Sequence, residues 1–184
     1  MNTDSGAVHP RHQLVFTLTL EDYIGANRLH WRASYKRPRT YRTWLWVMLF
    51  YGVLFLAIGQ SFRPHDIAVA AIVAVAGGIG AMIVCGLIGL LALPGRSRRL
   101  FAQQKTLHQE QRVSIEEDVI RFEGANFHLT HPWSDFPRWN ESSRFILLYI
   151  SDNAFHILPA RALTVDARAS TRQALEKAGV RKDR

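Results

Sequence analysis

The chain has 184 residues and a formal net charge of +8, so it has room for one modest domain and something small. Its single cysteine excludes an intramolecular disulfide, and nothing therefore supports an oxidising compartment. The basic balance is typical of proteins that meet nucleic acid or an anionic membrane surface.

Apolar residues are concentrated in one part of the chain. The mean hydropathy of -0.05 is that of a soluble protein, but residues 43–95 are almost wholly apolar and both flanks are polar and basic. The opening "MNTDSGAVHPRHQ" contains no apolar run, so no secretory signal peptide is expected there.

Residues 1–42 are predicted to form a strand followed by a basic amphipathic helix. The stretch "LVFTLTL" alternates as a strand does, and from Glu21 the apolar positions follow a helical period. Ile24, Trp31 and Tyr35 share one face with cations beside it, which is typical of a helix at a bilayer surface. The side chains expected to contact lipid, here and after the apolar region, are Arg28, Trp31, Arg32, Lys36, Arg96, Arg98 and Arg99.

These cations have a simpler interpretation, as ordinary juxtamembrane charge that only enforces topology. Nucleic-acid binding is not expected. It needs a folded basic face or a stacking platform, whereas these cations are predicted to lie against a bilayer.

The apolar region is predicted to cross a membrane twice. Residues 67–93 carry no charge and exceed the roughly 20 residues that a helix needs to span hydrocarbon. Residues 43–62 are a second uncharged run, with tryptophans in the first half as expected at the headgroup level. Only residues 63–66 separate the two runs, which is enough for a turn. Pro94 and Gly95 are expected to end the second helix.

Basic residues flank the two spans on their outer sides. Between residues 28 and 42 there are six arginines and lysines and no acid, and residues 96–105 carry four more. The turn offers only Arg63, beside Asp66. The positive-inside rule therefore predicts that both termini lie in the cytoplasm.

Small residues recur every four positions along the second span. This spacing gives two adjacent ridges along a helix, one from Gly77 to Gly89 and one from Ala70 to Gly78, where a neighbouring backbone can approach closely. The expected packing positions are Ala70, Ala74, Gly77, Gly78, Ala81, Cys85 and Gly89. The neighbour is either the bulky first span or another copy of the chain. Alternatively, alanine and glycine are merely frequent in membrane helices.

Residues 106–184 are predicted to form a cytoplasmic α+β domain. Alternating apolar positions predict a hairpin around Glu117 and Asp118, a strand at "NFHLTH" and three strands up to Pro159. The run "FILLYI" is apolar on both faces, which places it centrally or against the terminal helix. That helix is expected to have Thr164 as its N-cap. Its end is expected at Gly179, and its buried stripe is expected to be Thr171, Ala174, Leu175 and Ala178.

This order, of about five antiparallel strands and one C-terminal helix, is the layout of a pleckstrin-homology (PH)-like antiparallel β half-barrel. The whole prediction is a membrane α-helical hairpin plus this domain.

The chain resembles the YcxB-like family of small bacterial membrane proteins, whose C-terminal domain is related to bacterial PH-like domains. The resemblance rests on "VFTLTLEDY", the two-span hairpin, "VSIEEDVIRF", "WSDFPRWNESSRFILLYIS" and "ILPARAL". It implies an integral protein of the bacterial plasma (inner) membrane with a cytoplasmic β module and no assigned reaction. The family's proline-plus-basic step maps onto Pro159 and Arg161, but Ala160 stands where lysine is expected, and this departure argues against an anion site at the step.

No catalytic, cofactor or metal chemistry is expected. His128 and His131 are the only close histidine pair in the domain, and on a strand they would face opposite sides. The serines lie in turn contexts, where backbone bonding explains them better than nucleophilic catalysis. Neither span carries the buried ionisable residue that usually marks a transport path.

Two further features have alternative interpretations. Trp133 is expected in the core, or as a lid over it, rather than as a ligand contact. Arg138, Arg144 and Arg161 form either a membrane-facing basic patch or, with Glu141 close by, a solvated face of ion pairs.

The pattern as a whole favours a membrane protein that presents a PH-like module at the inner leaflet. Its expected role is binding of a protein partner or an anionic lipid headgroup, helped by confinement to the surface. The alternative is a structural role, in which the small residues of the second span drive homo-oligomerisation. Membrane lipids are an expected partner in both interpretations.

Overall fold

The computed structural model describes residues 11–35, 38–58 and 66–183. It divides into two compact units, which are described separately. The β unit consists of Met1–Leu29 and Ser97–Arg184, and the helical unit of His30–Arg96. Both divisions fall inside helices, α1 (Leu20–Tyr35) and α3 (Asp66–Gln103).

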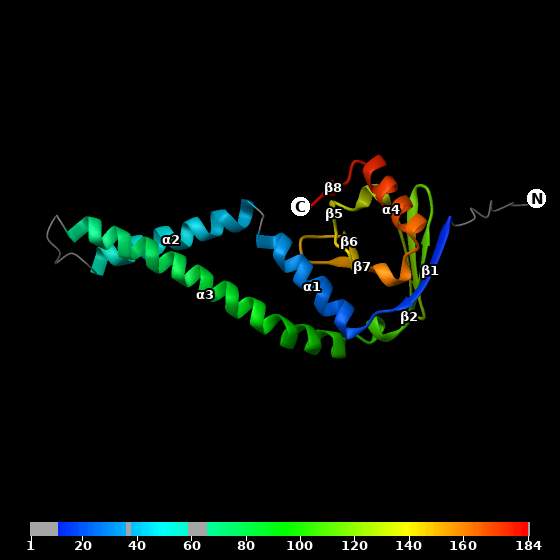
Figure 1. Ribbon diagram of the computed structural model, residues 1–184, viewed down its shortest axis with the longest axis horizontal. Coiled ribbons are helices and arrows are strands. Elements are labelled where there is room, and N and C mark those ends of the chain that lie inside the picture. Colours follow the sequence, from blue (N-terminus) through cyan, green and yellow to red (C-terminus); the bar gives the residue numbers. More distant parts are fainter. Residues whose placement is uncertain (1–10, 36–37, 59–65, 184) are drawn as a thin grey trace, which may run out of the picture. The chain divides into compact units, whose positions relative to one another are not determined.

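The first sheet of the β unit is an antiparallel meander of four strands (Figure 1). Its order is β1 (His12–Thr17), β2 (Glu110–Ile115), β3 (Val119–Gly124) and β4 (Phe127–Pro132). The alternation seen in the sequence sets its faces, because successive side chains of a strand point to opposite sides.

The register shows how the first sheet builds the core. Leu14 lies opposite Val113, which lies opposite Phe122, and all three are buried. Val15, the neighbour of Leu14, is 53% exposed. The predicted strand is therefore confirmed. Its place is a correction, because the sequence left it in a separate N-terminal segment, 1–42, outside the 106–184 domain.

The second sheet has the order β7-β6-β5-β8. It consists of β5 (Arg138–Glu141), β6 (Phe145–Tyr149), β7 (Phe155–Pro159) and a short β8 (Arg181–Lys182) that runs parallel to β5. All five residues of β6 are buried, as expected for a central strand that is apolar on both faces. The three strands predicted before Pro159 are confirmed, whereas β8 was not predicted.

Three single turns of 3-10 helix join these elements: η1 (Lys105–His108), η2 (Trp133–Asp135) and η3 (Ala160–Ala162). They carry the chain from α3 to β2, from β4 to β5 and from β7 toward α4.

Helix α4 (Val165–Lys177) closes the β unit and follows the predicted capping. The side chain of Thr164 accepts a hydrogen bond from the backbone N–H of Ala167, which satisfies one of the free donors of the first turn. Gly179 has a φ of 69°, the left-handed conformation that glycine adopts at little cost after a helix. Thr171 and Leu175 are buried as expected, but Ala178 is exposed and Ala167 takes a buried position instead.

Helix α1 begins with reciprocal capping between Thr19 and Asp22. The backbone N–H of Asp22 donates to the Thr19 hydroxyl at 3.1 Å, and the N–H of Thr19 donates to the Asp22 carboxylate at 3.1 Å. A Cβ added at Gly25 would lie 2.8 Å from the Phe145 ring, so this glycine allows α1 to approach β6 closely. The first turns of α1 thus belong to the core, which the bilayer-surface prediction did not anticipate.

The helical unit contains α2 (Pro38–Ile58) and most of α3. Over Val75–Gln103, α3 is long and apolar enough to cross a membrane, and it is the one such helix among the described residues. The expectation that Pro94 and Gly95 end this helix was wrong, because α3 runs on to Gln103 with Pro94 inside it. Proline removes only one backbone donor, and the last turn gains the burial of Phe101 in the β-unit core.

The predicted turn lies mostly outside the described residues, which resume at Asp66. The first span is helical as far as Ile58, and the rest of residues 43–62 also lies outside them.

Candidate functional site

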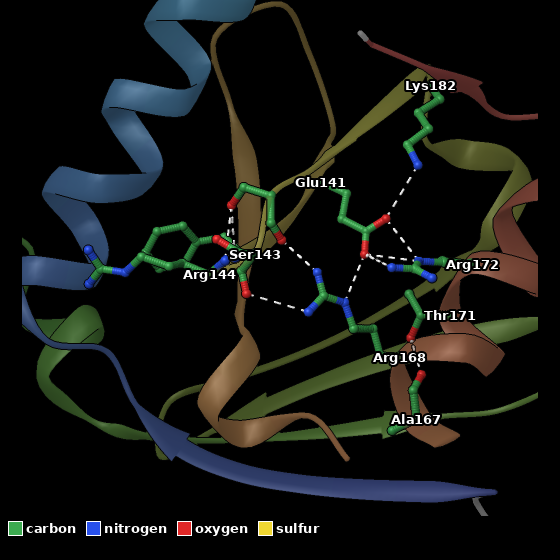
Figure 2. Close-up of polar contacts among 10 residues, drawn as sticks. Glu141, Ser143, Arg144, Ala167, Arg168, Thr171, Arg172 and Lys182 are labelled. Carbon is green, nitrogen blue, oxygen red and sulfur yellow. Dashed lines mark hydrogen bonds and ion pairs between the residues drawn. The ribbon is translucent and has the colours of Figure 1, made fainter. Parts of the chain in front are cut away.

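A cluster of charged side chains in the β unit surrounds the carboxylate of Glu141, the last residue of β5. Figure 2 shows Arg168 and Arg172 of α4 converging on it, with Lys182 of β8 reaching the same group. The Nε atoms of the two arginines lie 2.8 and 2.9 Å from its oxygens, and Lys182 Nζ lies 3.3 Å away. The side chain of Glu141 is only 7% exposed, so these contacts are sheltered from water.

The electrostatics of this cluster favour binding over proton transfer. Burial raises the pKa of Glu141, but hydrogen bonds from Arg172, Arg168 and Lys182 outweigh it and lower the pKa to about 2. A carboxylate with so low a pKa is a weak base near neutral pH. It is suited to holding cations in fixed positions.

The local sequence explains why the two arginines meet at one point. They stand four residues apart in α4, so they lie on the same face of the helix. Two like charges in this relation repel each other unless an acid lies between them. Arg168 also donates to the carbonyl oxygen of Ser142 at 2.6 Å, which ties α4 to the β5–β6 turn.

Arg138 and Trp139 of β5 bind the C-terminal segment, residues 180–183. Arg138 is 8% exposed and forms an ion pair with Asp183, and its guanidinium carbon lies 3.5 Å from the centre of the Tyr149 ring. Trp139 is fully buried, and its indole N–H donates to the carbonyl oxygen of Val180 at 3.2 Å.

A cleft of about 290 Å³ opens elsewhere in the β unit, between the start of α1, the segment after α3 and the β6–β7 hairpin. Among the described residues that line it there is no Asp, Glu, Lys or Arg, and the polar groups are Tyr23, amides such as Asn27 and Gln111, and His156. Such a lining suits an uncharged group.

The His156 ring is stacked on Phe122 with 4.0 Å between ring centroids, and His131 lies 5.5 Å away. Burial and the nearby His131 lower the pKa of His156 to about 4, so the imidazole is neutral at physiological pH. The Nε2 atoms of both rings are buried without a hydrogen-bond partner in the described part of the chain.

The structure does not bring His128 and His131 together as a metal pair. His128 is exposed with Nδ1 3.3 Å from Glu123, whereas His131 packs against the buried rings. Within residues 11–35, 38–58 and 66–183 no group of three or more histidines, cysteines or acids is placed to hold a metal ion.

The three arginines considered as a basic patch do not gather on one surface. Arg138 is buried against Asp183, and Arg161 pairs with Asp22 at 2.7 Å. Arg144 is exposed and lies over the Phe145 ring. Two of the three are therefore ion-paired, but not as a solvated face around Glu141, because Arg138 is buried and Glu141 pairs with Arg168, Arg172 and Lys182 instead. Trp133 is 2% exposed and donates to the carbonyl oxygen of Glu116, which confirms the core interpretation.

The residues expected to contact lipid fall in different parts of the chain. The five exposed ones are Arg28, Arg32, Arg96, Arg98 and Arg99. Trp31 is half-buried in the helical unit, and a Cβ at Gly89 would lie 3.5 Å from its Nε1 atom. It therefore packs on α3 there. Lys36 lies outside the described residues.

The predicted small-residue positions divide into packed and open ones. Gly78 is buried, and a Cβ there would lie 3.3 Å from Met48 of α2. Gly77 and Cys85 are exposed, and Ala81 is half-buried. The side chains of Ala70 and Ala74 lie outside the described part of the structure.

Sequence reasoning missed the role of Glu141 as the centre of a cation cluster. It also missed the tail strand and the stacked His156. The signal available for Glu141 was the arginine pair in α4, whose mutual repulsion is relieved by an acid nearby. For β8 there was no local signal, because two residues carry no periodicity.

One comparison with known proteins gave a match. The family model described as YcxB-like protein matches residues 115–174, from the last residue of β2 into α4. The match covers much of the β unit and none of the helices α1 to α3. The searches of curated proteins and of solved structures found no match.

Proposed function

We propose that this chain, whose residues 115–174 match the YcxB-like family model, is a two-span membrane protein that presents this domain as a binding module at the cytoplasmic face of a bacterial inner membrane. In this proposal the β unit is a PH-like half-barrel, a fold supported by its two small sheets and the terminal helix α4. No catalytic role is part of the proposal.

The observation that carries the proposal is the pairing of β1 with β2. The two strands flank α2 and α3 in the chain, and they form an antiparallel ladder from His12–Ile115 to Thr17–Glu110. Paired strands must lie on the same side of a membrane. The chain between them therefore crosses an even number of times, and if α3 spans, the run at 43–62 must span too.

Charge supports the orientation. The cations before the first span and after the second outnumber those in the turn, which favours a cytoplasmic β unit. The exposure of Arg96, Arg98 and Arg99 along α3 agrees with this placement, because exposed cations are available to anionic headgroups.

The binding partner favoured by the geometry is a protein rather than a lipid headgroup. Arg161, Arg168 and Arg172 each already face a carboxylate that is not part of the C-terminal tail. An anionic headgroup bound by these side chains would have to displace those carboxylates. A protein partner can use the backbone edge and the mixed charges together.

Cysteine accessibility in cells tests the topology. In a Cys85→Ser chain, single cysteines replace His65 in the predicted turn and Gln173, which is exposed on α4. A membrane-impermeant thiol reagent is expected to label position 65 in intact cells and position 173 only after permeabilisation. Labelling of 173 in intact cells would mean the opposite orientation, and labelling of neither would contradict an exposed turn.

A second candidate function is homo-oligomerisation through α3. The observation in its favour is the exposure of Gly77 and Cys85 in a single chain, with nothing within 4 Å of a Cβ added at Gly77. Small residues in this arrangement let a second helix approach.

A further inference from the structure

We propose that the outer edge of β5 is a docking site for an extended segment of a partner protein, and that the C-terminal tail fills this site in cis. The tail is residues 181–183. The partner segment is expected to have the same charge order as Lys182 and Asp183, a cation followed by a carboxylate. The inference rests on the proposed function, because it names the partner class of that binding module.

Backbone pairing places the tail on the edge as an added strand. Arg181 lies opposite Arg138 and Lys182 opposite Trp139 in a parallel ladder. The N–H of Asp183 donates to the carbonyl oxygen of Trp139 at 2.8 Å. Addition of an extended peptide to a sheet edge is a common mode of peptide recognition, in which the main chain supplies affinity.

Two side-chain subsites give this edge its selectivity. The first takes a cation: Lys182 Nζ lies 4.4 Å from the centre of the Trp139 ring and 3.3 Å from Glu141 Oε2. The second takes a carboxylate: Asp183 forms an ion pair with Arg138, whose side chain is 10% exposed. Both subsites are assembled by β5 and its neighbours, with Arg168 and Arg172 fixing Glu141 (Figure 2).

The tail is attached in a way that allows exchange. Its ladder is only two residues long, and Arg181 and Lys182 are both exposed. The Asp183 side chain is 9% exposed against Arg138, and it is the contact that a partner's carboxylate would have to replace. None of its three side chains belongs to the hydrophobic core, whereas the preceding Val180 packs against that core. A rearrangement confined to residues 181–183 would therefore leave the core and α4 in place.

Peptide binding to a truncated chain tests the proposal. The chain ending at Val180, purified in detergent, is titrated against a fluorescent acetylated peptide RKDR, with anisotropy as the measured quantity. We expect RKDR to bind the truncated chain. Its binding to the full chain is expected to be at least about tenfold weaker, because the tethered tail competes for the same edge at a high effective concentration. The peptide RDKR has the same composition with cation and acid exchanged, and it is expected to bind the truncated chain about tenfold more weakly than RKDR.

Substitution locates the site. Glu141→Gln in the truncated chain is expected to weaken RKDR binding, because the cation loses its carboxylate. Exposed Glu117, which contacts Arg11 and Lys177, provides the matched control Glu117→Gln with no expected effect. Equal binding of RKDR and RDKR, or equal binding to the full and truncated chains, would overturn the proposal.

Folding of the variants is checked by circular dichroism and thermal unfolding. If truncation unfolds the chain, the full-length double variant Lys182→Ala, Asp183→Ala replaces it, with the same binding expected. Unfolding of both would make the tail a permanent strand and contradict the proposal. Dimers that disappear on truncation would identify a second copy as the occupant, which also contradicts it.

The two proposals can fail separately. The peptide measurement is made in detergent and does not depend on orientation, and the labelling at position 65 does not depend on the tail. Loss of peptide selectivity with the expected labelling would leave the membrane module standing without this docking edge.

Discussion

Protonation of His156 is expected to destabilise the folded β unit. The ring of His156 is stacked on Phe122 and lies 5.5 Å from His131, and its Nε2 atom has no hydrogen-bond partner among the described residues. Burial first, and the charge of His131 second, lower its pKa from 6.5 to about 4. Between about pH 4 and pH 6.5, His156 is therefore protonated in the unfolded chain and neutral in the folded chain.

The free energy of unfolding is therefore expected to fall as the pH decreases from about 6.5 to about 4, with the His156 contribution complete above 6.5. The expected loss is on the order of 3 kcal/mol, since one pKa unit corresponds to about 1.4 kcal/mol. Denaturant unfolding of the full chain at several pH values measures it. His156→Phe keeps a stacked ring and should flatten this part of the profile. Identical slopes for both chains would assign the acid sensitivity to other groups.

At the same scale, local sequence patterns predicted some residues well. Thr164 and Gly179 indicate the ends of α4, because the N-cap and the left-handed position after a helix have strong residue preferences. The environment of Glu141 was not predictable in this way. Its cations come from α4 and from the tail, and no pattern along β5 identifies such distant partners.

Among the elements, α1 and β6 show how a close approach depends on a missing side chain. A Cβ at Gly25 would lie 2.8 and 2.9 Å from two carbons of the Phe145 ring, and Phe145 is 3% exposed. The ring has little room to move, because the interior around it is closely packed.

Gly25→Ala is expected to lower the free energy of unfolding of the β unit by about 1–2 kcal/mol, since overpacking outweighs the better helix propensity of alanine. Thermal unfolding of the purified chain measures the change. Gly95→Ala is the matched control, because it also lies within a helix but has nothing within 4 Å. If Gly25→Ala were as stable as Gly95→Ala, the Phe145 ring would have an alternative position.

Strand positions were predictable from alternation, but their pairing was not. The alternation in "LVFTLTL" marks β1 and its buried face, because burial has the period of the strand. Which strand it joins depends on contacts far along the chain, and the two apolar runs between β1 and β2 conceal that relation. The continuation of α3 past Pro94 was missed for a similar reason, since the burial of Phe101 is a tertiary effect.

For the molecule as a whole, two adjacent glycines of α3 distinguish packing within one chain from packing between chains. Gly78 faces Met48, whereas Gly77 beside it is exposed with no neighbour within 4 Å of an added Cβ. These adjacent positions provide a matched pair of substitutions.

Gly77→Leu is expected to leave the molecular mass in detergent and the thermal stability unchanged, as measured by light scattering and thermal unfolding. Gly78→Leu is expected to lower the stability, because the added side chain meets Met48. A fall in mass confined to Gly77→Leu would instead favour the homo-oligomer as the functional form.

The pairing of β1 with β2 has a consequence for the order in which this protein is made. The ribosome releases β1 early, but its partner strand is synthesised only after α2 and α3. Under the proposed topology, β1 stays unpaired in the cytoplasm until both helices have entered the bilayer and β2 has emerged. Closure of the first sheet then coincides with completed insertion. A chain with one helix stranded would expose the apolar face of β1 to the quality-control machinery of the cell.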